Sequence, residues 1–203
     1  MKNISLKQRL ALELNRRLKL ERRREHPLRQ IFWECTWRCN LACRHCGSDC
    51  KSSSLLPDMP AGDFLKVIDS VIPHVDPHIV NIVITGGEPL VREDIEYVGR
   101  HLYDREFPWG IVTNGLLLTE NRFESLRRAG LHNIAISLDG LEETHNWMRN
   151  NPKSFERAHE AIKMVAKAED LNFDVVTCVN RKSLPHLNEL KELLIDAGVK
   201  KWR

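Results

Sequence analysis

Short runs rich in Ile and Val alternate with longer segments of helical spacing along most of the chain. The runs are apolar throughout rather than at every second position, and they end near Gly, Asn or Asp, which is typical of buried strands. Strands of this type form parallel sheets covered by helices. The predicted strands are Gln30–Glu34, Ile79–Thr85, Trp109–Thr113, Asn133–Leu138 and Phe173–Val179.

The segments between these runs carry recognisable helix ends. We expect helices that begin at Pro60 after an Asp58 cap, after a Thr119 cap, at Ser154 and at Ser183. The second of these helices stops near Gly130 and the last at Gly198, because glycine commonly follows a helix C-terminus. Strands and helices therefore alternate as five βα units.

The chain is too short for a closed barrel of such units. A sixth strand starts at Val199 and is cut off at Arg203, so we expect an incomplete protein that is truncated at its C-terminus. An eight-unit barrel typically needs ~250 residues, more than the 203 present. The predicted fold class is α/β, a partial, open parallel TIM-like barrel in which residues 30–203 form one domain.

Residues 1–29 differ from the rest and are expected to form a basic N-terminal helix and linker. An amphipathic helix is predicted by leucines that recur every four residues, Leu6, Leu10, Leu14 and Leu18. This helix either packs against the body of the protein or lies on a membrane surface, since basic residues flank the leucines. The polar stretch 22–27 after it is predicted to be the linker.

Composition and charge narrow the class of protein. The chain is 42% hydrophobic and has no apolar run near the ~20 residues of a membrane span, which excludes a disordered or membrane-spanning protein. After the first 29 residues there are 21 basic and 25 acidic residues, so a nucleic-acid partner is not expected. Glu13, Arg16 and Arg17 interrupt the apolar core of a secretory signal. We therefore expect a cytoplasmic protein, whose cysteines more often serve metal or redox chemistry than disulfides.

A cysteine array carries the strongest chemical signal. Cys39, Cys43 and Cys46 form a C-x3-C-x2-C pattern after the first predicted strand, in the loop at its carboxyl end. Ligands bind at that end in parallel α/β proteins. Three soft thiolates can each bind a different iron of a cubane cluster. One iron then has no protein ligand, and an open position of this kind indicates chemistry rather than a structural site.

The remaining cysteines leave alternatives open. Structural zinc usually needs four ligands in two pairs, and here only one pair has that spacing, with Cys35, Cys50 or His45 as the fourth donor. Cys50 is close enough in sequence to be a spare cluster ligand, although a structural role is favoured. Cys35 and Cys178 are expected to be small buried residues on strands.

A second motif, Gly86-Gly87-Glu88-Pro89, follows the second predicted strand. Two glycines allow close approach of the backbone to a ligand, and the motif places a carboxylate at the strand end. With the cysteine array, it resembles the radical S-adenosylmethionine (SAM) superfamily over residues 31–203. His45 stands where that family usually carries another aromatic residue. The resemblance implies that Gly86, Gly87 and Glu88 hold the methionyl amino group of SAM.

Three weaker motifs follow the later strands in the order of that family, Thr113-Asn114-Gly115, Ser137-Leu138-Asp139-Gly140 and His145-Asn-Trp-Met-Arg149. Alone, each is an ordinary turn, cap or salt bridge. Their order resembles the branch with C-terminal auxiliary-cluster (SPASM-type) extensions, such as peptide-modifying and sulfatase-maturing enzymes. The resemblance implies cofactor contacts by Asn114, by Ser137 and Arg149 on the methionyl carboxylate, and by Asp139 on the loop or ribose.

The resemblance also implies a reaction. A [4Fe–4S] cluster would reductively cleave SAM to a 5′-deoxyadenosyl radical, which abstracts hydrogen from a peptide, protein or small-molecule substrate. The electron would come from a donor such as flavodoxin or ferredoxin. A non-catalytic iron–sulfur electron-transfer or metal-binding module is the alternative, although electron carriers usually close the cluster with four cysteines. An interaction protein on a degenerate enzyme fold is a third interpretation.

Overall fold

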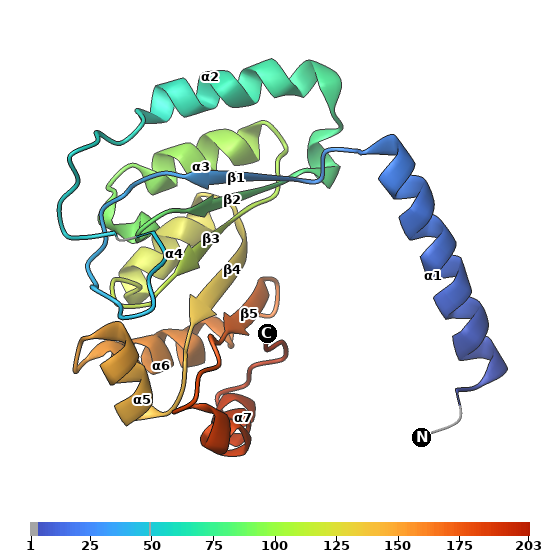
Figure 1. Cartoon of the computed structure of the whole chain (residues 1–203). Helices are drawn as coiled ribbons and strands as arrows, with labels where there is room; N and C mark the ends of the chain where they lie inside the picture. Colours follow the sequence, from blue (N-terminus) through green and yellow to red (C-terminus); the bar gives the residue numbers. More distant parts are fainter. Residues whose placement is uncertain (1–3, 49) are drawn as a thin grey trace.

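The computed structural model describes residues 4–48 and 50–203 and contains a single curved sheet. All strand pairs are parallel, and the strands follow one another across the sheet in chain order, so β1 and β5 are its edges (Figure 1). The strands are β1 (Gln30–Glu34), β2 (Asn81–Thr85), β3 (Trp109–Thr113), β4 (Leu131–Ser137) and β5 (Asn172–Val176). The sheet is open, which confirms the predicted α/β partial barrel.

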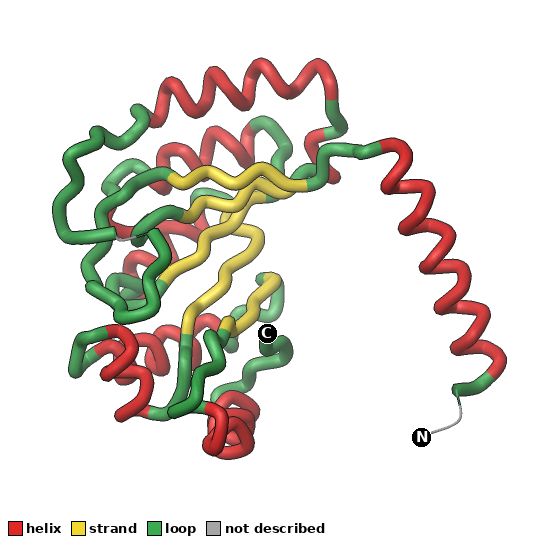
Figure 2. Tube along the Cα trace, in the orientation of Figure 1, coloured by secondary structure: helices red, strands yellow, loops and turns green. Residues whose placement is uncertain are grey.

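Helices connect the strands and cover one face of the sheet (Figure 2). On that face the strands contribute a continuous apolar core, to which Trp33, Ile84 and Ile136 belong. The opposite face is concave and borders an open cavity of about 740 Å³. The α-helices are α1 (Leu6–Glu25), α2 (Ala61–Val71), α3 (Ile95–Asp104), α4 (Glu120–Arg128), α5 (Glu142–Arg149), α6 (Ser154–Val165) and α7 (Leu187–Asp196). Short 3₁₀ helices are η1 (Ile72–His74), η2 (Pro77–Ile79), η3 (Pro89–Val91) and η4 (Leu184–His186).

Strand ends differ from the prediction where other backbone contacts intervene. The second strand starts at Asn81 rather than Ile79, because η2 occupies the preceding residues. The fourth starts two residues early, at Leu131. The fifth ends at Val176 rather than Val179, because the following loop turns toward β4, with Thr177 Oγ1 donating to the Leu138 carbonyl at 2.6 Å.

Of the two predicted helix caps, one is confirmed and one is wrong. Thr119 caps α4, since its side chain accepts from the N–H of Arg122. Asp58 does not cap α2; its carboxylate lies 2.7 Å from Arg38 Nη2. The predicted helix start at Ser154 is confirmed, since Ser154 is the first residue of α6. The segment expected to open at Ser183 begins with the short η4 and continues directly as α7.

The N-terminal helix is longer and more exposed than predicted. α1 reaches Glu25, so the stretch from residue 22 is helical rather than a linker. All four leucines of the predicted stripe are at least half exposed, and α1 projects away from the sheet and its helices (Figure 1). The interpretation that this helix packs against the body of the protein is therefore wrong. The first three residues lie outside the described part of the chain, and within that part no helix is long and apolar enough to cross a membrane.

The C-terminal residues pair with the edge of the sheet. Val175 and Trp202 form a parallel bridge, and the Arg203 N–H donates to the Val175 carbonyl at 2.9 Å. Trp202 packs against the core, and its Nε1 donates to Thr177 Oγ1 at 2.8 Å. The start of a sixth strand, expected from Val199 onward, is therefore present as a bridge beside β5.

Replacement of Gly99 by alanine should destabilise the protein by about 1–3 kcal/mol, as overpacking of a core does. The added methyl would overlap the ring of Trp109, which is fully buried between α3 and the sheet. Gly62→Ala in α2 is the matched control, because a methyl there meets no atom within 4 Å. That change should stabilise by about 0.4–1 kcal/mol. Urea unfolding measures the free energy of unfolding of both variants. Equal changes in the two variants would contradict tight packing at Gly99.

Candidate functional site

The cysteine loop lies at the carboxyl ends of the strands, as its position after β1 predicts. Its two ends are joined where the Cys39 N–H donates to the Lys51 carbonyl at 2.7 Å. Its middle is held to the end of α5, because the Arg44 N–H donates to the Met148 carbonyl at 2.8 Å. The described residues of the loop, 39–48 and 50–51, contain no helix or strand, and these two bonds define their course.

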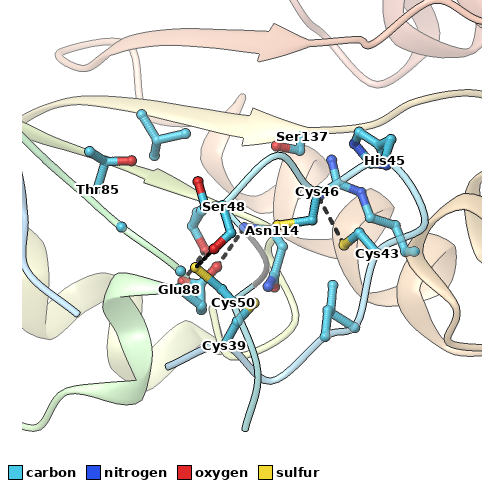
Figure 3. Close-up of a pocket in the computed structure, with 16 residues that line it drawn as sticks. Cys39, Cys43, His45, Cys46, Ser48, Cys50, Thr85, Glu88, Asn114 and Ser137 are labelled. Atoms are coloured by element: carbon cyan, nitrogen blue, oxygen red, sulfur yellow. Dashed lines mark hydrogen bonds between the residues drawn. The ribbon is translucent and has the colours of Figure 1, made fainter. Parts of the chain in front are cut away.

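The structure brings Cys39, Cys43 and Cys46 to one pocket of about 140 Å³. Cys43 and Cys46 lie on one side of it, and Cys39 lies on the other beside Cys50, toward Glu88 (Figure 3). The pocket is also lined by the other residues that the resemblance predicted, except Asp139, and these are His45, Gly86, Gly87, Glu88, Asn114, Ser137 and Arg149. Sequence motifs separated by more than 100 residues thus meet at one place.

The three thiols differ in burial, and the surroundings of Cys39 and Cys43 favour the protonated form of these two. Burial raises the pKa of Cys39 to about 11. Burial also raises the pKa of Cys43, an effect that the nearby Arg149 guanidinium partly offsets. Cys46 is exposed at the rim. Metal binding would therefore release protons from this loop, since the thiolate is the ligand.

The glycine pair packs against the cysteine loop. A Cβ on Gly86 would overlap the Thr36 carbonyl oxygen, and one on Gly87 would overlap that of Arg38. Gly86 also has a φ of 134°, a backbone conformation that residues other than glycine rarely adopt. Because the Gly87 N–H donates to the Thr36 carbonyl at 2.8 Å, the motif joins the end of β2 to the start of the loop. The two glycines thus allow the end of β2 to approach the backbone of the chain before the cysteine loop.

The Glu88 carboxylate is fully buried and joins two strand ends. Its Oε1 accepts from the Leu90 N–H at 3.1 Å and from Thr113 Oγ1 at 2.8 Å. Its Oε2 accepts from the Asn114 N–H at 2.8 Å. Burial raises the pKa of Glu88, and the three donors oppose that rise. Two carboxylate oxygens offer about four acceptor positions, so one remains for a further donor.

Asn114 extends this connection to the cysteine loop. Its Nδ2 donates to Asn40 Oδ1 at 2.8 Å, next to Cys39. Its own Oδ1 accepts from the Leu116 N–H at 2.9 Å and so fixes the turn after β3. Asn40 carries no signal in the sequence beyond its place inside the array, and only the fold shows that it contacts the end of β3.

Arg149 and Asp139 form a buried ion pair beside the pocket. Arg149 Nε donates to Asp139 Oδ2 at 2.7 Å, and Asp139 Oδ1 accepts from the Cys178 N–H at 3.0 Å. Burial lowers the pKa of Arg149, but Asp139 and Cys43 more than offset this, so the guanidinium stays charged. Asp139 thus orients a loop, whereas its predicted contact with a ribose stays a prediction.

His145 helps to position that ion pair through a hydrogen bond with the backbone of Asp139. The Asp139 N–H donates to His145 Nδ1 at 2.9 Å, and His145 Nε2 lies 3.0 Å from Ser154 Oγ. Since Nδ1 accepts, the proton of the neutral ring is on Nε2 and points at the serine. Burial, with a further contribution from Arg149, lowers the pKa of His145 to about 4. The ring is therefore an uncharged support at neutral pH.

The other cysteines fall in three different places. Cys35 is buried at the end of β1, as expected, and burial raises its pKa to about 12. Cys178 is exposed in the loop after β5, so the expectation of a buried strand residue is wrong. Cys50 is buried and lines the pocket beside Cys39. The spacing of Cys50 in the sequence did not show whether this residue lines the pocket or is a structural residue elsewhere.

The pocket residues fit an iron–sulfur cluster better than a single metal ion. Among residues 4–48 and 50–203, no three His, Cys, Asp or Glu side chains converge where one ion could be held. The three thiols instead surround a shared pocket, as a cluster requires because each thiolate binds a different iron. Soft sulfur donors also suit iron–sulfur chemistry.

The chain is similar to known proteins in sequence. The sequence profile described as the radical SAM superfamily matches residues 33–194. An AdoMet-dependent heme synthase of Methanosarcina barkeri is 34% identical over 171 residues, which are 84% of this chain and 48% of the relative. A PqqA peptide cyclase of Bradyrhizobium diazoefficiens is 26% identical over 82% of this chain and 43% of its own length. The chain therefore spans about half the length of these curated relatives.

A solved structure shows the same fold. SuiB of Streptococcus suis, crystallised with S-adenosylmethionine, superimposes with a TM-score of 0.72 at 16% identity. The match covers 100% of this chain and 47% of SuiB. At this identity the likeness establishes the arrangement of strands and helices.

Proposed function

The chain belongs to the radical SAM superfamily, whose cofactors are a [4Fe–4S] cluster and SAM, and on this premise we propose that it is the catalytic core of a radical SAM enzyme. When bound, the two cofactors supply a 5′-deoxyadenosyl radical that removes hydrogen from an unactivated C–H bond. The observation that carries the proposal is the meeting of Cys39, Cys43 and Cys46 with the glycine pair and Glu88 at one pocket.

In this proposal the chain's residues divide the binding between them. Cys39, Cys43 and Cys46 would hold the cluster, and no fourth cysteine is assigned, which leaves one iron for SAM. Gly86, Gly87 and Glu88 would hold the methionyl ammonium, since Glu88 retains one acceptor position beyond its three bonds. Ser137 and Arg149 would hold the carboxylate, and His45, Asn114 and Asp139 would complete the cofactor site.

The substrate would enter from the concave face of the sheet. The large cavity on that face and the cysteine pocket share Val112 in their linings, so the two adjoin. Phe32 is exposed there, and Asp174 and Arg203 form an ion pair on the same face. The wall therefore offers apolar and charged groups together. Peptide, protein and small-molecule substrates all fit this description, and the named relatives act as a heme synthase and a peptide cyclase.

The proposal also includes an electron donor and a cellular compartment. An external one-electron donor such as flavodoxin or ferredoxin would reduce the cluster. Cys35, Cys39, Cys43, Cys46 and Cys178 form no disulfide, which suits a reducing compartment, so we place the enzyme in the cytoplasm.

Anaerobic reconstitution with iron and sulfide tests the proposal. We expect about four irons per chain, as one cubane requires, and equal amounts of 5′-deoxyadenosine and methionine after SAM and a reductant are added. Mass spectrometry quantifies both products, and omission of the reductant is the control. A complete cluster without SAM cleavage would instead support an electron-transfer module. Binding of one zinc and no iron would show a structural metal site.

A further inference from the structure

Arg149 contacts a predicted cluster ligand directly. Its Nη1 lies 3.8 Å from Cys43 Sγ, within hydrogen-bonding range for sulfur, while its Nε is bonded to Asp139. The guanidinium side chain is only 11% exposed, so water screens this contact poorly. One buried cation is thus shared between a carboxylate and a thiol.

The geometry of this contact is fixed from several sides. Asp139 Oδ1 is held by the Cys178 N–H, and the Asp139 N–H is held by His145, whose other ring nitrogen meets Ser154. His145 and Ser154 are both fully buried. A chain of bonds from α6 through α5 to the end of β4 therefore keeps the guanidinium at the sulfur.

We propose that Arg149 sets the reduction potential of the cluster by donating a charge-assisted hydrogen bond to the Cys43 thiolate. The inference rests on the proposed function and adds to it a role that does not require SAM. One-electron reduction adds negative charge to the cluster and its thiolates, and a cationic N–H donor stabilises that charge. Arg149 therefore makes the cluster easier to reduce, and Asp139, His145 and Ser154 are positioning residues for it.

The test is a potentiometric titration of the reconstituted protein without SAM, followed by electron paramagnetic resonance. Without SAM, any contact of Arg149 with the methionyl carboxylate cannot contribute. In Arg149→Gln and Arg149→Met we expect the equilibrium constant for reduction to fall about tenfold, which is a shift of ~59 mV to more negative potential for a one-electron couple. The iron content should stay the same.

Two further variants separate the hydrogen bond from general charge and from misfolding. Arg44→Gln removes another positive charge beside Cys43 in the sequence, but Arg44 is exposed and bonds to the Trp147 carbonyl instead. It should shift the potential far less. Arg149→Lys keeps a charge for Asp139 if the neutral variants fail to fold. Because one ammonium lacks the planar fork that reaches both partners, it should still lower the potential.

The outcomes distinguish this inference from the proposed function. Unchanged potentials in all Arg149 variants, with the cluster intact, would overturn the role of Arg149 and leave the radical SAM assignment standing. Equal shifts in Arg44→Gln and Arg149→Gln would show that charge alone acts and would overturn the hydrogen bond. Absence of a cluster in the unmodified protein would overturn the proposed function itself.

Discussion

Replacement of Cys39, Cys43 or Cys46 by alanine should abolish the visible absorption of the reconstituted cluster and lower bound iron from about four per chain to near zero. The three thiols line one pocket, and each would bind a different iron, so none can be replaced by another. Loss of SAM cleavage should accompany loss of iron. Absorption spectra and iron analysis after anaerobic reconstitution provide the measurement.

Two other cysteines are the controls for this series. Cys178 is exposed and does not line the pocket, so Cys178→Ala should keep the full cluster. Cys50→Ala is the more demanding control, because Cys50 is buried in the pocket beside Cys39. We expect it to keep the cluster as well. A complete cluster in Cys43→Ala would refute the assignment, and loss of iron in Cys50→Ala would add Cys50 to the ligands.

Glu88→Gln should weaken SAM binding by roughly tenfold or more and leave the cluster in place. The variant removes the charge that would face the methionyl ammonium, and a hydrogen bond to a charged group is worth ~1.5–3 kcal/mol. The structure adds a second consequence. If the amide oxygen keeps the Leu90 and Thr113 bonds, the amide nitrogen faces the Asn114 N–H, and two donors oppose each other. Stability should therefore fall by about 1–3 kcal/mol.

Calorimetry with SAM and thermal unfolding separate these two effects. Glu93→Gln is the matched control, since Glu93 is an exposed carboxylate a few residues along the same segment. It should change neither quantity. If Glu88→Gln lowers stability but leaves SAM affinity unchanged, Glu88 serves only to join the ends of β2 and β3.

Local patterns in the sequence were sufficient for the architecture. Apolar runs mark buried strands wherever they occur, because each residue of such a strand faces either a helix or a neighbouring strand. The spacing of Cys39, Cys43 and Cys46 likewise lies within one loop. Neither feature depends on distant residues, so the positions of the strands and the presence of a cysteine site could be predicted.

Partners that are distant in the sequence were decided by the tertiary structure alone. Asp58 looks like a helix cap, but an arginine on the cysteine loop binds it. The sequence predicted a methionyl ammonium as the partner of Glu88, but it did not show that donors from its own turn and from the end of β3 surround the carboxylate. The contact of Arg149 with Cys43 spans 106 residues, and no periodicity or spacing encodes such a pair.

The sequence by itself therefore determined which residues form strands and which loop carries the thiols, because these follow from local hydrophobicity and spacing. The folded chain decided which polar groups meet in the space where the strand ends converge. Burial there removes water as an alternative partner, so each charged or polar side chain must be satisfied by whatever the fold places beside it. The exposure of α1 was decided in the same way, since its leucines specify an apolar stripe but not a surface that covers it.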